Sequence, residues 1–398
     1  MNKKSILITV CSFDIGGIEK SLTELLNVFD YDKYDVDVLC FSKRGELLPY
    51  VPQKCKILPE VSSLAALLEP IKSIAVSQPL IAFGRVASKI KVKLKYKNSE
   101  YSEDALNFAR AQEMWNCVIP FMPAIKKEYD IALSFMWPHH FVSKKVKAKK
   151  KIAWIHTDYT KAALDFKADE DIWDCFDYIA AVSDECGEAF KTVYPSLAEK
   201  VKTVENVLSP EMVRARAKEF APTELKCSGI KLVSVGRYCY AKGFDRIPEI
   251  CKFLTEAGHD IKWFIIGFGT DEDIIREQIK KYSTEERVIL LGKKTNPYPY
   301  IKDSDIYVQP SRYEGKAVSI REAQIIGKAV VIADFKTARS QVNDGIDAVV
   351  AGQSEKEIAD AIANLITDSA KKANLEEATA NADYGCGKQL EALYALLD

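Results

Sequence analysis

A strand, a loop and the beginning of a helix follow one another in Lys231-Leu-Val-Ser-Val235-Gly236-Arg237-Tyr-Cys-Tyr-Ala-Lys242-Gly243. The first five residues are mostly apolar, as in a buried strand, and the segment 244–256 that follows has helical spacing. Short apolar runs alternate with helix-like segments on both sides of this stretch. The alternation predicts an α/β fold, in which helices cover both faces of a parallel sheet.

The apolar runs form two groups, and the pattern fails between them. We predict strands in the first half at Ile6–Val10, Val36–Phe41, Ile131–Phe135, Ile152–Ile155 and Tyr178–Val182, and in the second half at Lys231–Val235, Trp263–Ile266, Val288–Leu291, Ile306–Gln309, Ala329–Ile332 and Ala348–Val350. Asn206, Pro210 and Pro222 interrupt the pattern around residues 201–225. We therefore predict two α/β domains, 1–208 and 209–370, and a C-terminal helix, 371–398, that returns to the N-terminal domain.

The composition is that of an ordinary globular protein, with 47% apolar and 28% charged residues and a net charge of −1. Ten cysteines, from Cys11 to Cys386, form no C-x-x-C pair and predict reduced thiols. The apolar stretch near the N-terminus is too short for a signal peptide, and no run reaches the roughly 20 apolar residues of a membrane span. We expect a cytoplasmic protein without a nucleic-acid partner.

Two stretches of the first half are locally basic, namely Arg85–Lys97 and Lys144–Lys151. Two interpretations stay open for them. They are either a solvated basic face, or a surface that attracts anionic lipid or a phosphorylated acceptor.

Candidate ligand contacts follow predicted strands, because open parallel sheets bind ligands beyond the carboxyl ends of their strands. Gly16 and Gly17 lie after the first strand and before a helix-like run, where backbone amides can approach an anion. A plain turn explains this pair equally well, since the G-x-G-x-x-G spacing is incomplete.

Arg237 and Lys242 lie on one strand-to-helix loop, and together they can converge on a diphosphate. Their charges would also stabilise a departing nucleoside diphosphate as it gains negative charge. The alternative is that both are solvated surface cations.

Glu314 and Glu322 follow the strand predicted at Ile306–Gln309. If a helix begins near Lys316, its free amides can hold phosphate oxygens, while the two carboxylates accept hydrogen bonds from sugar hydroxyls. The alternative is an incidental loop acid and a helix-surface charge.

These motifs resemble the retaining family-4 glycosyltransferases of the GT-B fold. That family carries G-R-x-x-x-x-K-G and, further on, two glutamates separated by seven residues, which Gly236–Gly243 and Glu314…Glu322 match in order. The helix, glycine turn and strand expected in Ala323-Gln-Ile-Ile-Gly327-Lys-Ala-Val-Val331 also resemble the family, so the likeness covers most of the C-terminal half. In the first half it rests on Gly16-Gly17, Trp154–Asp158, Val182-Ser183 and Asn206.

The resemblance implies two Rossmann-like domains that face each other across a cleft, and it implies roles for individual residues. Arg237 and Lys242 would bind the donor diphosphate, Glu322 the ribose, and Glu314 would face the transferred sugar. His156 would lie near the donor sugar, although a structural role for it stays open. The remaining donor contacts would come from Gly16, Gly17, Gly236, Gly315, Lys316 and Ala317.

Gly315-Lys316-Ala317 departs from the Gly-Phe-Gly or Gly-Phe-Pro that is frequent in the family, and this leaves the identity of the sugar open. The likeness implies retaining transfer of a hexose or N-acetylhexosamine from a nucleotide sugar, with UDP expected, to a lipid-linked or polysaccharide acceptor at the inner face of the cell membrane. We expect no cofactor and no metal, because Arg237 and Lys242 supply positive charge and the D-x-D triplets Asp30–Asp32, Asp35–Asp37 and Asp303–Asp305 lie before or at the start of strands.

Other functions remain open at this point. An epimerase or phosphorylase shares the two-domain plan, and a catalytically silent partner subunit that only binds nucleotide sugars would carry the same binding residues.

Overall fold

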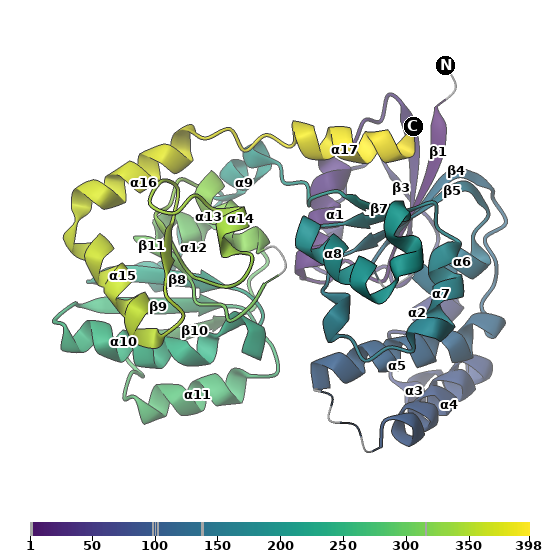
Figure 1. Cartoon of the computed structure of the whole chain (residues 1–398), viewed down its shortest axis with the longest axis horizontal. Coiled ribbons are helices and arrows are strands. Elements are labelled where there is room, and N and C mark those ends of the chain that lie inside the picture. Colours follow the sequence, from purple (N-terminus) through teal and green to yellow (C-terminus); the bar gives the residue numbers. More distant parts are fainter. Residues whose placement is uncertain (1–2, 98, 100, 102, 137–138, 315–316) are drawn as a thin grey trace. The chain divides into compact units, whose positions relative to one another are not determined.

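The computed structural model describes residues 3–97, 99, 101, 103–136, 139–314 and 317–398 (Figure 1). The chain divides into two compact units. The N-terminal unit comprises Met1–Leu208 and Cys386–Asp398, and the C-terminal unit comprises Ser209–Gly385. The division falls at residue 208, where the sequence pattern breaks, and each unit is described separately below.

A parallel sheet with strand order β3-β2-β1-β4-β5-β6-β7 forms the centre of the N-terminal unit. Its strands are β1 Lys4–Val10, β2 Tyr34–Cys40, β3 Lys56–Ile57, β4 Tyr129–Phe135, β5 Ala148–Ile155, β6 Tyr178–Ala181 and β7 Val201–Thr203. Its helices are α1 Gly17–Val28, α2 Ser62–Ala65, α3 Ile71–Ile74, α4 Pro79–Lys95, α5 Glu103–Val118, α6 His139–Lys145, α7 Phe166–Asp174, α8 Asp184–Val193 and α17 Gly387–Leu397.

The C-terminal unit contains a second parallel sheet, with strand order β10-β9-β8-β11-β12-β13. Its strands are β8 Ile230–Val235, β9 Ile261–Ile266, β10 Val288–Gly292, β11 Ile306–Gln309, β12 Val330–Ala333 and β13 Val349–Ala351. Its helices are α9 Pro210–Arg216, α10 Ile247–Glu256, α11 Glu272–Lys281, α12 Tyr298–Asp303, α13 Val318–Ile325, α14 Ala338–Gln341, α15 Glu355–Thr367 and α16 Ser369–Asn381.

Both sheets are apolar on both faces, and this is why the strands appear in the sequence as continuous apolar runs. In β1, the consecutive residues Ile6, Leu7 and Ile8 are all fully buried, and in β12 every residue is buried. The prediction of two Rossmann-like α/β domains is therefore confirmed. Strands β3 and β7 were not predicted, because they are edge strands of two and three residues and have too few apolar positions to show a pattern.

The C-terminal segment differs from the single helix expected at 371–398. It forms two helices, of which α16 belongs to the C-terminal unit and α17 to the N-terminal unit. Leu375 of α16 is buried in one core, while Leu393 and Leu397 of α17 are buried in the other. The chain leaves helical geometry at Ala382 (φ −68°, ψ 141°).

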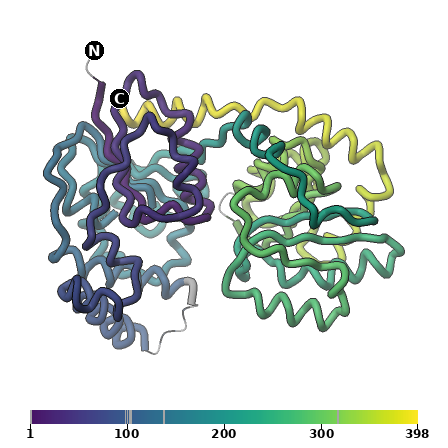
Figure 2. The backbone as a smooth tube through the Cα atoms, turned by 180° about the vertical axis from the view of Figure 1, so that it is seen from behind, coloured from purple at the N-terminus to yellow at the C-terminus, as the bar shows by residue number. Residues whose placement is uncertain are grey.

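Helix α17 lies beside the first strand of the N-terminal unit (Figures 1 and 2). The Tyr394 ring stacks on Tyr34 with 5.7 Å between ring centroids, and the Tyr394 hydroxyl accepts a hydrogen bond from the amide of Asp30 at 2.8 Å. The Lys4 ammonium reaches Asp398 at the end of the chain. Within the part of the chain that the structure describes, no helix is long and apolar enough to span a bilayer.

We predict that Leu393→Ala lowers the stability of the N-terminal unit by about 2–5 kcal/mol, because it leaves a cavity beneath α17. In hydrogen exchange, the amides of β1 should lose protection while those of β8 keep it. The matched variant Leu375→Ala in α16 should do the reverse. Loss of protection in β8 with Leu393→Ala would contradict the division of the C-terminal segment.

Candidate functional site

Strands β8 and β11 are neighbours at the point where the C-terminal sheet changes direction. From β8 the chain runs to β9 and β10 on one side, and it then crosses over to β11 on the other. Ligand crevices in open parallel sheets form at the carboxyl ends of the strands at such a reversal. The loop after β8 carries Arg237 and Lys242, and the loop after β11 carries Glu314.

Gly243 allows these two loops to touch. Its φ of +66° lies in the left-handed region, and a Cβ at this position would overlap the carbonyl oxygen of Pro310. The Arg312 amide donates to the carbonyl of Ala241 at 2.8 Å, and the Arg312 guanidinium makes two hydrogen bonds of 2.7 Å to the carboxylate of Asp245. This carboxylate raises the pKa of Arg312. The two loops are therefore joined by backbone contact and by a bidentate ion pair.

Lys242 and Glu314 form an ion pair across these loops, with 2.5 Å between Nζ and Oε1. Their side chains are only 19% and 9% exposed, so solvent screens the pair less than it screens a surface pair. The Ser311 hydroxyl also donates to Glu314 Oε1 at 2.6 Å, and the Gln309 amide donates to Ser311 Oγ at 2.8 Å. The structure thus brings together two predicted site residues that are 72 positions apart.

Gly236 makes room for the stem of Lys242. A Cβ at residue 236 would lie 3.2 Å from Phe244 Cζ and 3.3 Å from Lys242 Cδ. Arg237, the next residue, is exposed and makes no hydrogen bond or ion pair with the other described residues. Its guanidinium is therefore available to a ligand.

The start of α13 is organised by Gln341. The Ala317 amide donates to Gln341 Oε1 at 2.9 Å, so the protein itself occupies one of the amides predicted for the donor. Gln341 Nε2 donates to Thr337 Oγ1, which donates to the carbonyl oxygen of Glu314 at 3.0 Å. The predictions for Gly315 and Lys316 concern residues outside the described ranges.

Glu322 lies inside α13 and is 2% exposed. The Tyr298 hydroxyl donates to its Oε1 at 3.3 Å. Because its side chain is buried, Glu322 is not a helix-surface charge, which was the alternative that the sequence left open. No described contact joins it to Glu314.

The loop Gly267-Phe268-Gly269 after β9 also belongs to this region and was not predicted from the sequence. A Cβ at Gly267 would overlap the carbonyl oxygen of Gly236, and one at Gly269 would overlap that of Tyr238. The Tyr238 amide also donates to the carbonyl of Phe268 at 2.8 Å. The signal was present as a Gly-x-Gly directly after a predicted strand.

In the N-terminal unit, Gly16 and Gly17 lie at the start of α1, as predicted. Gly16 has extended backbone (φ −156°), and a Cβ on Gly17 would have no neighbour within 4 Å among the described residues, so neither glycine is needed for local geometry. The carboxylate of Glu19 lies over Gly16. An anion that approaches this helix start would therefore meet a negative charge at Gly16 and open space at Gly17.

His156 directly follows β5, and its imidazole lies against Phe135, with 4.8 Å between ring centroids. Its Nε2 is buried without a hydrogen-bond partner among the described residues. Burial lowers the pKa of His156 to about 3, so the ring is neutral near pH 7. A neutral ring with an unused nitrogen can exchange a hydrogen bond with a ligand.

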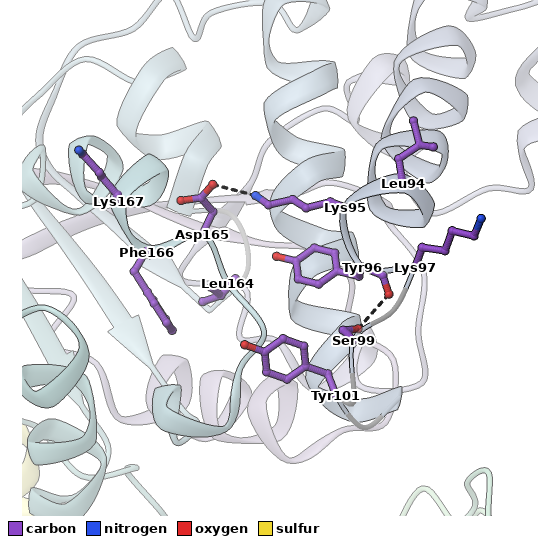
Figure 3. A pocket seen from close by; sticks show the side chains of 10 residues that line it. All are labelled: Leu94, Lys95, Tyr96, Lys97, Ser99, Tyr101, Leu164, Asp165, Phe166 and Lys167. Carbon is purple, nitrogen blue, oxygen red and sulfur yellow. Dashed lines mark hydrogen bonds and ion pairs between the residues drawn. The ribbon is translucent and has the colours of Figure 1, made fainter.

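The D-x-D triplets and a hollow of the N-terminal unit involve other residues than those predicted for the site. Asp37 is in β2 and accepts hydrogen bonds from Lys127 and Tyr129, and the described residues contain no cluster of three metal-ligating side chains. A hollow of about 780 Å³ opens between the end of α4 and residues 164–167 of the N-terminal unit (Figure 3). It contains none of the predicted site residues.

The contact between Gly243 and Pro310 can be tested with a pair of glycine variants. Gly243→Ala should lower the stability of the C-terminal unit by about 3 kcal/mol, because a left-handed alanine is strained and its methyl group overlaps Pro310. Gly258→Ala is the control, since Gly258 also has positive φ (+87°) but no neighbour within 4 Å in the described structure. It should cost only about 1 kcal/mol. Equal losses in urea unfolding would argue against the close approach.

Stability of the N-terminal unit should depend on pH through His156. Its folded pKa, about 3, lies below the unfolded value of 6.5, so only the unfolded chain takes up this proton as the pH falls between these values. The contribution of His156 to stability should therefore be constant above pH 6.5 and fall below it, by about 1.4 kcal/mol per pH unit.

Urea unfolding followed by tryptophan fluorescence measures this effect, because three of the four tryptophans among the described residues, Trp115, Trp154 and Trp173, belong to the N-terminal unit. His156→Gln should weaken the pH dependence, and His259→Gln, a change in the other unit, should leave it as in the wild type. Identical pH profiles for the wild type and His156→Gln would contradict the burial of this imidazole.

The C-terminal part of the chain is similar in sequence to a known protein family. Residues 215–382 match the model of the family described as "Glycosyl transferases group 1". The amylovoran biosynthesis glycosyltransferase AmsD of Erwinia amylovora is 29% identical over 157 residues, which are 39% of this chain and 44% of AmsD. A 4-alpha-N-acetylgalactosaminyltransferase of Campylobacter jejuni, named for a diphospho-undecaprenol substrate, is 29% identical over 111 residues, 28% of this chain and 30% of that enzyme. The aligned segments thus span less than half of either relative.

Similarity of structure extends over nearly the whole chain. HepE of Anabaena, solved with UDP and glucose, superposes with a TM-score of 0.69 over 99% of both chains at 15% sequence identity, which shows a common fold. The chain therefore has the two-domain GT-B fold, and its residues 215–382 carry the sequence pattern of the glycosyl transferases of group 1.

Proposed function

We propose that this chain is a retaining glycosyltransferase, which moves a hexose or an N-acetylhexosamine from a UDP-sugar to a lipid-linked or polysaccharide acceptor. The observation that carries the proposal is the pair of Lys242 and Glu314 at the reversal of the C-terminal sheet. The family match over residues 215–382 supports transfer from a nucleotide sugar. The UDP bound to HepE supports the choice of nucleotide.

In the proposed complex, the diphosphate lies beyond β8 and β11. Lys242 would bind it as a point charge, and the exposed Arg237 would bind it with a planar fork. The leaving UDP gains negative charge as the bond to the sugar breaks, so both cations act more strongly in the transition state than in the ground state. These two charges are the reason to propose a reaction that needs no metal.

Donor binding would change the partner of Lys242. In the structure, the Lys242 ammonium is held by Glu314, and in the proposed complex a phosphate oxygen would compete for the same Nζ. Glu314 would keep the hydrogen bond from Ser311 and direct its carboxylate to hydroxyl groups of the sugar. Binding of the donor would thereby replace the ion pair of Lys242 and Glu314 with contacts to the ligand.

Two further residues complete the proposed site. Glu322, held by the Tyr298 hydroxyl, would accept hydrogen bonds from the ribose. The neutral ring of His156 would exchange a hydrogen bond with the donor sugar through its unused Nε2. We assign neither Glu314 nor Glu322 as a covalent nucleophile. We propose attack from the face of the departing phosphate, which itself helps to remove the acceptor proton.

The acceptor side of the proposal rests on the relatives. AmsD is named for the biosynthesis of a polysaccharide and the Campylobacter enzyme for an undecaprenol-linked substrate. We propose an acceptor of one of these two kinds, and action in the cytoplasm at the inner face of the cell membrane.

A panel of nucleoside-diphosphate sugars, scored by thermal shift and by donor hydrolysis, tests this function. Lys242→Ala should weaken binding of the preferred donor about 10- to 100-fold, the value of a charge-assisted hydrogen bond. Lys252→Ala, which removes an exposed lysine of α10, is the matched control and should bind as the wild type does. Equal donor affinity in Lys242→Ala and the wild type would refute the site.

Glu314→Gln separates binding from transfer. This variant frees Lys242 from its partner, so the donor should bind at least as tightly while hydrolysis and transfer decrease. Donor binding without any turnover in the wild type would favour a silent binding subunit instead of a transferase.

A further inference from the structure

Helix α4 has an apolar surface on two opposite sides. Its inward side, with Ile81 and Val92, is buried against the neighbouring helices, and Figure 1 shows α4 at the periphery of the N-terminal unit beside α3 and α5. Its outward side carries large apolar side chains at helical spacing, with exposures of 58%, 65%, 55% and 72% for Leu80, Phe83, Ile90 and Leu94. We call these four residues the α4 stripe.

Such a stripe is unusual on a surface helix, whose outward side is normally polar. At 100° per residue, the α4 stripe falls on one narrow arc, opposite the buried side of the helix. Val86, 44% exposed, widens it on one side. Contiguous exposed apolar side chains of this kind mark an interaction surface.

Unpaired lysines flank the α4 stripe. Lys91 lies along one side of it and Lys89 and Lys93 along the other, and Lys97 follows the end of the helix. All four are exposed, and none makes an ion pair or hydrogen bond with the residues that the structure describes. The surface therefore combines apolar side chains with four uncompensated positive charges.

Three lysines of the second basic run have partners in the fold, while Lys144 and Lys147 are exposed. Lys149 pairs with Asp130 at 2.8 Å, Lys150 donates to the carbonyl of Leu396 at 2.9 Å, and Lys151 donates to that of Ser143 at 2.9 Å. These side chains hold β5 and its neighbours together. In the run Arg85–Lys97, by contrast, the exposed lysines alternate with the exposed Ile90 and Leu94.

The hollow of about 780 Å³ lies at the end of the α4 stripe (Figure 3). The rings of Tyr96, Tyr101 and Phe166 line it, and Lys95 forms a hydrogen bond of 2.7 Å with Asp165 across it. Leu94, the last residue of the stripe, and Lys97 also line this hollow (Figure 3).

We propose that α4 docks on an anionic phospholipid bilayer, with the helix parallel to the surface, the α4 stripe inserted between the lipids and the lysines among the headgroup phosphates. An apolar side flanked by lysines is what holds interfacial helices on such membranes. A second copy of the chain fits less well, because it would bring four unpaired lysines close to their own counterparts. The inference deepens the proposed function by naming the surface that meets the membrane.

Sedimentation of the full chain with lipid vesicles tests the inference. The wild type should bind vesicles of phosphatidylcholine mixed with phosphatidylglycerol, and should bind phosphatidylcholine alone at least about tenfold more weakly. Phe83→Ser/Ile90→Ser/Leu94→Ser should lose at least about tenfold in binding to the mixed vesicles. The same loss of binding is expected for the variant Lys89→Gln/Lys91→Gln/Lys93→Gln/Lys97→Gln. High salt should also weaken binding of the wild type to the mixed vesicles.

Two matched controls alter similar residues elsewhere. Lys144→Gln/Lys147→Gln removes exposed charges of the second basic run, and Ile274→Ser/Ile346→Ser removes exposed apolar side chains of the C-terminal unit. Both should bind vesicles as the wild type does. Unchanged binding of either α4 variant, or equal binding of the wild type to neutral vesicles, would overturn the inference.

Light scattering of the same proteins without lipid identifies the rival occupant. If the wild type is an oligomer that the α4 stripe variant dissociates, and vesicles do not bind, the surface joins two copies of the chain and the inference is wrong. Vesicle binding requires no sugar transfer. A protein that binds vesicles but no nucleotide sugar would therefore refute the proposed function and leave this inference standing.

Discussion

The close approach of Gly243 to Pro310 is the constraint on which the candidate site depends. The two loops come into backbone contact here because residue 243 has no side chain in the way and adopts left-handed geometry, which glycine tolerates. Once they meet, Lys242 lies within 2.5 Å of Glu314. The bidentate pair between Arg312 and Asp245 then holds the loops together.

The two cations of this loop differ in their exposure to solvent. The ammonium of Lys242 is kept under partial burial by a carboxylate, whereas the guanidinium of Arg237 on the same loop is exposed. A cation that is already desolvated and oriented loses little on binding an anion, while an exposed one can approach from solution. A diphosphate, with two groups to bind, suits both.

The N-terminal unit has the same α/β architecture, and two of its features need a separate explanation. Its sheet ends in a buried, neutral imidazole at His156, and at its periphery α4 presents apolar side chains to solvent. Neither feature is explained by the stability of the unit, because an unused buried nitrogen and an exposed apolar stripe both raise the free energy of the folded state. The donor sugar proposed for His156 and the lipid surface proposed for α4 would account for these two features.

Local patterns in the sequence determined most strands and the break near residue 208, because burial on both faces of a sheet gives runs of consecutive apolar residues. They also determined the spacing of Gly236, Lys242 and Gly243, because the geometry of one loop depends on consecutive residues. Short edge strands such as β3 carried too few residues for a pattern. Tertiary structure alone decided that Lys242 meets Glu314, that α17 packs in the N-terminal core while α16 does not, and that Lys149, Lys150 and Lys151 have partners while Lys89, Lys91 and Lys93 have none among the described residues. These facts depend on contacts between residues far apart in the chain, for which no single segment contains both partners.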